Sequence, residues 1–302
     1  MIFDSMKDCF ASLNEKIFDA IQTSDLENIF KTLDSIEGPT LVCGVGGSSV
    51  VGNFLAKVLR EKKNEIVTFV FPRDIKYMNL SGYKNVIAIS YSSSNVGVDV
   101  CFNNNLNKYL LSTKPRDGVN NMIYKMKQEI SYVSIAATLV PLTIAFLYYK
   151  NDLALVKEIL SNTITTDSCA NRYEVMTGNE TVTASTMLES CIVESGIGAC
   201  VVHDKYNYCH GRINLSYFDK SDLIFFRMDN ELDKLFDEKL RSHFNKVITI
   251  DRKYDDNVIN DYYATYLSLK LVESIAINKG LDFSDINYFE DNDLFYLFKG
   301  EM

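Results

Sequence analysis

Two hydroxyl-rich turns, each directly after an apolar run, are the segments of this sequence best suited to bind an anion. The first is Gly44-Val-Gly-Gly-Ser-Ser49, after residues 40–43, and the second is Ser90-Tyr-Ser-Ser-Ser-Asn95, at the end of residues 86–90. A strand, a glycine turn and a serine at a helix start leave backbone N–H groups free, and the helix dipole attracts negative charge. We therefore expect the turns to hold the phosphate of a small ligand. The candidate contacts are Gly47, Ser48, Ser49, Ser90, Ser92, Ser94 and Asn95.

The same two turns are also compatible with a purely structural role or with a nucleotide site. Serine before a helix is commonly only a cap, and Ser and Asn are favoured in turns that bind nothing. A dinucleotide site would need a third glycine, which Gly44-x-Gly46-x-x-Ser49 lacks. It would also need an acid at the end of the second strand, where Phe71 and Pro72 stand. We therefore expect no nicotinamide or other cofactor.

The totals of the sequence are typical of a globular cytoplasmic protein. Of the 302 residues, 47% are apolar and 24% are charged, and the net charge of −9 argues against nucleic acid or an anionic membrane as a partner. The seven cysteines include no C-x-x-C pair, so we expect reduced thiols, and three scattered histidines predict no metal site. We expect no signal peptide in residues 1–12 and no membrane span in residues 134–149, a stretch shorter than the roughly 20 residues required.

The elements that position the two turns alternate between strands and helices. Helical spacing over residues 3–36 predicts two N-terminal helices. Strands are expected at 40–43, 66–71, 86–90 and 108–111 with helices between them, followed by a helix near 122–128 and a long one from 134. The second half has expected strands at 199–203, 223–228 and 247–250, and a last helix at 261–280. This alternation predicts an α/β fold with doubly wound parallel sheets.

The predicted organisation is N-terminal helices over 1–37, a first domain over 38–160 and a second, similar domain over 161–302, with the polar stretch 160–171 as the linker. Neighbouring parallel strands present their carboxyl ends at one edge of a sheet. The turns 44–49 and 90–95 are therefore expected side by side.

Several motifs, in this order, resemble the sugar isomerase (SIS) domain. The run Gly46-Gly-Ser-Ser-Val-Val-Gly52 and the turn at residues 90–95 are similar to the family's two serine motifs, of which the second usually reads S-x-S-G-N-T. Residues 129–134 resemble the glutamate and serine before the family's long interdomain helix. Residues 207–212, Asn-Tyr-Cys-His-Gly-Arg, resemble E-x-x-H-G, and residues 276–282 resemble a last helix that ends in G-x-D. The resemblance covers roughly residues 38–285 as two tandem, flavodoxin-like SIS halves.

The resemblance implies a homodimer that isomerises an aldose to a ketose, on a sugar phosphate or an amino sugar phosphate, through an enediol. It implies catalytic roles for Glu129 and His210, and ligand contacts for Asn207 and Arg212. Asn207 stands where the family has its base glutamate, and an amide cannot accept the proton. Asp204, on the same loop, is a candidate substitute base.

Glu189 and Glu194, on a helix predicted over residues 183–195, are further candidates for that base. Alternatives stay open for the other site residues. Glu129 is equally well interpreted as a brace of the long helix, and Arg212 as the partner of an acid. For His210, the alternative to a site role is a structural role in a glycine turn. Two functions therefore remain: a phosphosugar isomerase with a substitute base, or a sensor or regulator that binds the phosphosugar without catalysis.

Overall fold

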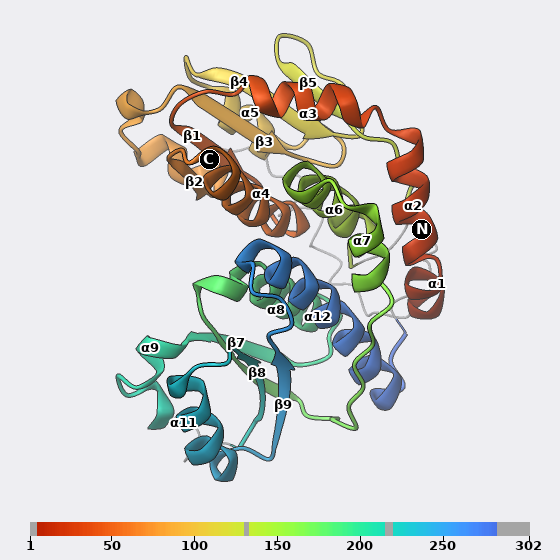
Figure 1. Ribbon diagram of the computed structural model, residues 1–302, viewed down its shortest axis with the longest axis vertical. Helices are drawn as coiled ribbons and strands as arrows, with labels where there is room; N and C mark the ends of the chain where they lie inside the picture. The colour runs from red at the N-terminus through yellow and green to blue at the C-terminus, as the bar shows by residue number, and fades with distance from the viewer. Residues whose placement is uncertain (1–4, 130–132, 215–219, 283–302) are drawn as a thin grey trace. The chain divides into compact units, whose positions relative to one another are not determined.

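The computed structural model describes residues 5–129, 133–214 and 220–282 of the chain (Figure 1). These residues form two compact units that divide between Asp152 and Leu153. No helix in these three ranges is long and apolar enough to cross a membrane.

The first unit is built on a five-stranded parallel sheet with the order β2-β1-β3-β4-β5 (Figure 1). The strands are β1 (Thr40–Cys43), β2 (Val67–Val70), β3 (Asn85–Ile89), β4 (Asn107–Ser112) and β5 (Asn120–Ile123). The helices are α2 (Leu13–Thr23), α3 (Leu26–Ser35), α4 (Gly47–Lys63), α5 (Val96–Phe102) and α6 (Ala136–Lys150), preceded by α1 (Met6–Ala11), with short 3-10 helices η1 (Pro72–Tyr77) and η2 (Leu80–Gly82). This strand order reverses direction between β1 and β3, and in doubly wound sheets ligands bind at that reversal.

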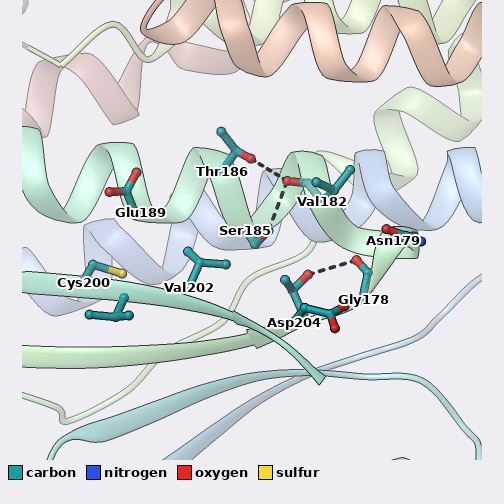
Figure 2. Close-up of a pocket in the computed structure, with 11 residues that line it drawn as sticks. Gly178, Asn179, Val182, Ser185, Thr186, Glu189, Cys200, Val202 and Asp204 are labelled. Carbon is teal, nitrogen blue, oxygen red and sulfur yellow. Dashed lines mark hydrogen bonds between the residues drawn. The ribbon is translucent and has the colours of Figure 1, made fainter. Parts of the chain in front are cut away.

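The second unit contains a four-stranded parallel sheet with the order β7-β6-β8-β9. The strands are β6 (Arg172–Thr177), β7 (Ala199–Asp204), β8 (Asp222–Arg227) and β9 (Lys246–Asp251). The helices are α7 (Leu153–Ile159), α8 (Val182–Glu194), α9 (Lys205–Tyr208), α11 (Glu231–Leu240) and α12 (Asn257–Lys279), with 3-10 helices η3 (Asn179–Thr181), η4 (Arg212–Asn214) and η5 (Arg241–His243). Figure 2 shows α8 above the edge strand β7. The predicted α/β class with parallel sheets is thus confirmed.

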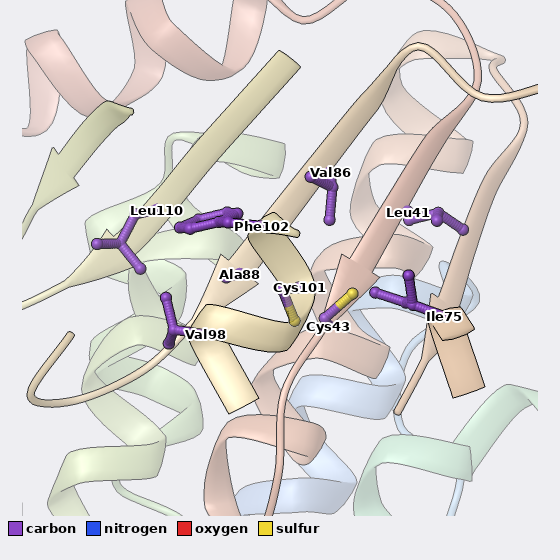
Figure 3. Packing of buried hydrophobic residues seen from close by; sticks show 9 residues of the cluster. All are labelled: Leu41, Cys43, Ile75, Val86, Ala88, Val98, Cys101, Phe102 and Leu110. Atoms are coloured by element: carbon purple, nitrogen blue, oxygen red, sulfur yellow. The ribbon is translucent and has the colours of Figure 1, made fainter. Parts of the chain in front are cut away.

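Each sheet is covered by apolar side chains from its crossover segments. In the first unit, α5 and η1 bury one face of the sheet (Figure 3), where the packed residues are Leu41, Cys43, Val86, Ala88 and Leu110 of the strands with Ile75, Val98, Cys101 and Phe102. The helices α4 and α6 pack on one another, and α4 lies on β1, β2 and β3. In the second unit, α11 packs on β6 and β8 through Phe236 and Leu240.

The helix predicted near residues 122–128 is wrong, since residues 120–123 form β5, parallel to β4, and residues 124–128 are not helical. Met122 and Tyr124 are both buried while their neighbours are not, which is the two-residue period of a strand and not helical spacing. The N-terminal segment forms three helices and not two. The structure also contains β6, a central strand that the hydrophobic pattern did not predict, and α7 within the second unit.

Candidate functional site

The glycine turn after β1 is fixed by close packing. Gly46 has φ +58° and ψ −134°, a conformation that residues with a side chain rarely adopt, and α4 begins at the next residue, Gly47. A Cβ on Gly44 would lie 2.2 Å from the carbonyl oxygen of Ser48. The chain therefore enters α4 so tightly that only glycine suits these positions.

Part of the expected donor set at this turn is already used. The N–H of Ser48 donates to the carbonyl of Val45 at 3.2 Å, and that of Ser49 to Gly46 at 2.8 Å. The Ser49 hydroxyl also donates to Gly46, at 2.7 Å. The expectation of free N–H groups at these two residues is therefore wrong, and Ser49 acts as a structural brace of the turn.

The serine turn after β3 is tied to the segment that follows β4. The N–H of Ser90 donates to the carbonyl of Leu111, and Thr113 donates to the carbonyl of Tyr91 through both its N–H and its hydroxyl. Ser93 has φ +61° and occupies the place where the SIS motif has glycine. The hydrogen bonds to the segment after β4 therefore fix a turn in which Ser93, a residue with a side chain, adopts the left-handed conformation.

Other polar side chains of the serine turn bond within it. The hydroxyls of Ser92 and Ser94 are 3.0 Å apart, and the Asn95 side chain accepts a hydrogen bond from the N–H of Gly97 at 2.6 Å, which caps α5. Asn95 therefore has a structural role in addition to any contact with a ligand.

The two turns meet at one edge of the first sheet. The strands β1 and β3 pair in parallel with Cys43 opposite Ala88, so the residues that follow them lie side by side. Ser48 and Ser90 line a cavity of about 30 Å³ between the turns, together with Asn95. Neither serine hydroxyl has a hydrogen-bond partner in the described part of the chain. The cavity itself has room for about one water molecule.

Arg116 adds positive charge beside the serine turn, and no sequence motif pointed to it. One guanidinium nitrogen donates to the carbonyl of Ser93 at 3.4 Å and another pairs with Asp99 at 2.5 Å, and the guanidinium lies over the Phe102 ring. Arg116 lies in the loop after β4, the strand that neighbours β3. A basic residue in that loop is the sequence signal that could have revealed it.

Glu129 caps the helix α6. One carboxylate oxygen accepts the N–H of Ala136 and the other accepts the N–H of Ala137, both at 3.0 Å. Burial and the negative charge of Glu129 raise the pKa of Tyr91, so Glu129 also lies close to the serine turn. The bracing role considered for this residue is present in the structure, and both of its oxygens take part in it.

In the second unit, Asn207, His210 and Arg212 project from one segment that is anchored from within. Asp204 caps α9 by accepting the N–H groups of Tyr206 and Asn207 at 3.1 and 3.0 Å. The side chains of Asn207, His210 and Arg212 are exposed. The structure thus groups these predicted residues on the surface of the second unit.

The anchor of this segment is a pair of buried side chains. Lys205 is 4% exposed and pairs with the fully buried Asp233 at 2.7 Å, and Tyr208 packs edge-on against His203 with 5.1 Å between the ring centroids. His203 is itself buried, with its Nε2 3.3 Å from a Glu174 carboxylate oxygen. His203 is therefore a structural residue of the second unit.

Glu189 and Asp204 line one cavity of about 500 Å³ in the second unit (Figure 2). Burial raises the pKa of both Glu189 and Glu194. Glu194 lies on the same helix outside the lining of this cavity, and its carboxylate accepts a hydrogen bond from Ser190 at 2.6 Å. In the described residues, no group of three His, Cys, Asp or Glu side chains could hold a metal ion.

Comparison with solved structures identifies similar folds across almost the whole chain. The tagatose-6-phosphate ketose/aldose isomerase of Escherichia coli superposes with a TM-score of 0.68 at 11% identity, over 94% of this chain and 95% of that one. The glucosamine-6-phosphate deaminase of Thermotoga maritima gives 0.66 at 12%, over 92% and 98%. The C-terminal domain of the glucosamine-fructose-6-phosphate aminotransferase of Francisella tularensis gives 0.63 at 15%, over 92% and 96%.

No protein-family model and no curated protein sequence matches the chain. The similarity to the solved structures is therefore one of fold, at identities too low to carry residue roles. It agrees with the resemblance that the serine turns and the later motifs indicated. The chain has the fold of the sugar isomerase (SIS) domain proteins, as its sequence predicted.

Proposed function

We propose that this chain binds a phosphorylated sugar at the carboxyl ends of β1 and β3. The observation that carries the proposal is the pair of serine hydroxyls, Ser48 and Ser90, which lie at the reversal of the sheet order without partners among the described residues. Two hydroxyls that are free to donate suit phosphoryl oxygens, and α4 directs its positive dipole end to the same place. The similar fold of a glucosamine-6-phosphate deaminase and of a tagatose-6-phosphate ketose/aldose isomerase supports this ligand class.

The phosphoryl group would lie at the mouth of the cavity, because the cavity has room for only one water molecule. Arg116 beside the serine turn supplies positive charge for this position, although Asp99 neutralises part of it. The remaining candidate contacts differ in the hydrogen bonds that their hydroxyls already make within the protein. Ser92 and Ser94 bond to each other and can turn toward a ligand, whereas Ser49 donates its hydroxyl proton to the turn itself.

The activity that we propose to test is aldose–ketose isomerisation. It requires a base that moves a proton between C1 and C2 of the sugar, and Asn207 cannot act as that base. Asp204 is the first substitute, because one of its carboxylate oxygens has no bond to the α9 cap. The family resemblance implies substrate contacts for His210 and Arg212, which are exposed on the same segment as Asp204.

A non-catalytic phosphosugar sensor is the second candidate function. Two observations favour it: Asn207 replaces the expected base, and both oxygens of Glu129 accept hydrogen bonds from the start of α6. A carboxylate occupied in this way is poorly placed to exchange protons. In a sensor, the phosphate turns keep their role and the acid–base chemistry is absent.

The deciding experiment incubates the protein with fructose 6-phosphate in heavy water and follows the sugar by NMR. Deuterium at C1 or C2 supports the isomerase, and Asp204→Asn should then abolish the exchange while preserving the cap, because Asn is as good a cap as Asp. Saturable binding without exchange supports the sensor. Absence of binding across a panel of phosphosugars, measured by thermal shift, would refute the shared proposal.

We also propose that the protein is a cytoplasmic homodimer. The apolar stretch at residues 134–149, which could also form a subunit interface, is mostly buried within the first unit as part of α6, so the fold of one chain already accounts for its hydrophobicity. The dimer proposal therefore depends on the family resemblance, and light scattering at micromolar concentration tests it. A monomer would contradict it.

A further inference from the structure

The second unit contains a cavity of about 500 Å³ that is separate from the phosphate turns (Figure 2). It lies between α8 and the edge strand β7, and residues after β6 close one end. Its volume is in the range of about 300–1,000 Å³ that is usual for small-molecule sites. Its polar groups decide what it can bind.

The hydroxyls that line the cavity offer lone pairs and not protons. Thr186 and Ser185 both donate to the carbonyl of Val182, at 2.7 and 3.1 Å. The Thr177 hydroxyl lies 2.8 Å from the Thr181 hydroxyl and 3.2 Å from the carbonyl oxygens of Gly178 and Thr181. The hydroxyl protons of Thr186 and Ser185 are therefore committed to the backbone, and Thr177 bonds within the turn after β6. What they present to the cavity are acceptor oxygens, which suit a ligand that donates hydrogen bonds.

The cavity has a carboxylate at each end. Asp204 stands at the end of β7 near Gly178, and Glu189 lies on α8 above Cys200, near the start of the strand (Figure 2). Burial, together with the charge of Glu189, raises the pKa of the Cys200 thiol to about 12, and the second cause agrees with that proximity. From Cys200 to Asp204 the strand advances by about 13 Å at its usual rise per residue.

Between the two carboxylates the wall is apolar. Val182 of α8 and Val202 of β7 line the middle of the cavity. None of the described lining residues is lysine or arginine. The adjacent Lys205 directs its ammonium group away, to the buried Asp233. No lining cation therefore neutralises the carboxylates of Glu189 and Asp204. Because these two negative charges repel an anion, the cavity disfavours a phosphate.

We propose that this cavity binds an elongated aliphatic di- or polyamine. One ammonium group pairs with Glu189 and the other with Asp204, and the methylene chain packs against Val182 and Val202. The hydroxyl oxygens accept the remaining N–H donors. An ammonium beside Glu189 also offsets the cost of burying its charge, because charged groups are stable in partly buried positions when they are paired.

The test is calorimetric titration with spermidine at low ionic strength, with 1,8-octanediol as a neutral probe of similar shape. We expect saturable binding of spermidine and none of the diol. Glu189→Gln and Asp204→Asn should each weaken binding by about tenfold or more, as for a lost hydrogen bond between charged groups. Asn keeps the α9 cap, so Asp204→Asn changes the charge and not the fold.

The matched control is Glu194→Gln, which removes the same charge from the same helix outside the cavity lining. We expect it to change spermidine affinity by less than about twofold, since Glu194 does not line the cavity and its carboxylate already accepts a hydrogen bond from Ser190. An equal loss in Glu194→Gln, equal binding of the diol, or no saturable binding of spermidine would each overturn the proposal. Spermidine binding that persists in the Ser48→Ala, Ser90→Ala variant would show that this site is independent of the phosphate turns. Loss of that binding would overturn the proposal of a separate site.

Discussion

Removing the hydroxyls of Ser48 and Ser90 is the most direct perturbation of the phosphate turns. A hydrogen bond to a charged group contributes about 1.5–3 kcal/mol, so each Ser→Ala substitution should weaken phosphosugar binding by about 10-fold to 150-fold. Neither hydroxyl has a protein partner among the described residues, so the free energy of unfolding should change by less than about 0.5 kcal/mol. The double variant should therefore lose affinity and keep its stability.

Ser49→Ala should behave in the opposite way. The Ser49 hydroxyl donates to the carbonyl of Gly46 at 2.7 Å, so its removal should cost about 1 kcal/mol of stability and leave affinity nearly unchanged. The assay is calorimetric titration with the phosphosugar that binds best, together with urea unfolding of each variant. Unchanged affinity in the double variant, or a loss of affinity in Ser49→Ala as large as that in the double variant, would refute the reasoning.

Three other predictions concern stability. Burial alone would raise the pKa of Glu174, but hydrogen bonds from His203 and a neighbouring serine outweigh it, so the folded-state pKa is lowered. Glu174 therefore contributes fully to the free energy of unfolding above its unfolded-state pKa of about 4.3, and this contribution is lost as the pH falls through the lower folded-state pKa. Urea unfolding measured against pH should show this pH-dependent contribution in the wild type and not in Glu174→Gln. Lys205→Met leaves Asp233 buried without its cation and should cost about 3–5 kcal/mol in urea unfolding; a cost under about 1 kcal/mol would contradict the importance of the pair. Gly44→Ala forces the turn after β1 to move and should cost about 1–3 kcal/mol in the same assay, with weaker phosphosugar binding, and wild-type values for both would show that the turn adapts.

The phosphate turns were predictable from the sequence because local signals and topology agree there. Apolar runs ended by Gly or Ser predicted β1 and β3. Their adjacency follows from the rules of parallel sheets. Which hydroxyls are free could not be predicted, since the bonds of Ser49 and Asn95 depend on the detailed geometry of each turn. Arg116 was missed for a similar reason, because its contact with Ser93 joins loops that are separated in the sequence.

The missed strand β6 illustrates a different limit. Its residues include Arg172 and Glu174. Central parallel strands are usually apolar along their whole length, so a prediction from the hydrophobic pattern rejects a segment with two charged residues. Glu174 is nonetheless fully buried, because His203 and Ser221 reach it from the neighbouring strand and loop. Such partners become visible only when the tertiary structure brings them together. The strand β5 was misread as a helix because it is short and contains a single buried residue, Met122, so that only Tyr124, beyond its end, completes the two-residue period.

The inward anchoring of α9 has a consequence for how this surface can change. The buried side chains of Lys205 and Tyr208 hold the segment on the second unit. The exposed side chains of Asn207, His210 and Arg212 are therefore not required for the stability of the fold. Substitutions there should be tolerated almost freely, and Asn207→Glu would restore the carboxylate of the family motif on an intact scaffold. One segment of this kind allows a lineage to gain or lose proton-transfer chemistry through single replacements while the rest of the domain stays as it is.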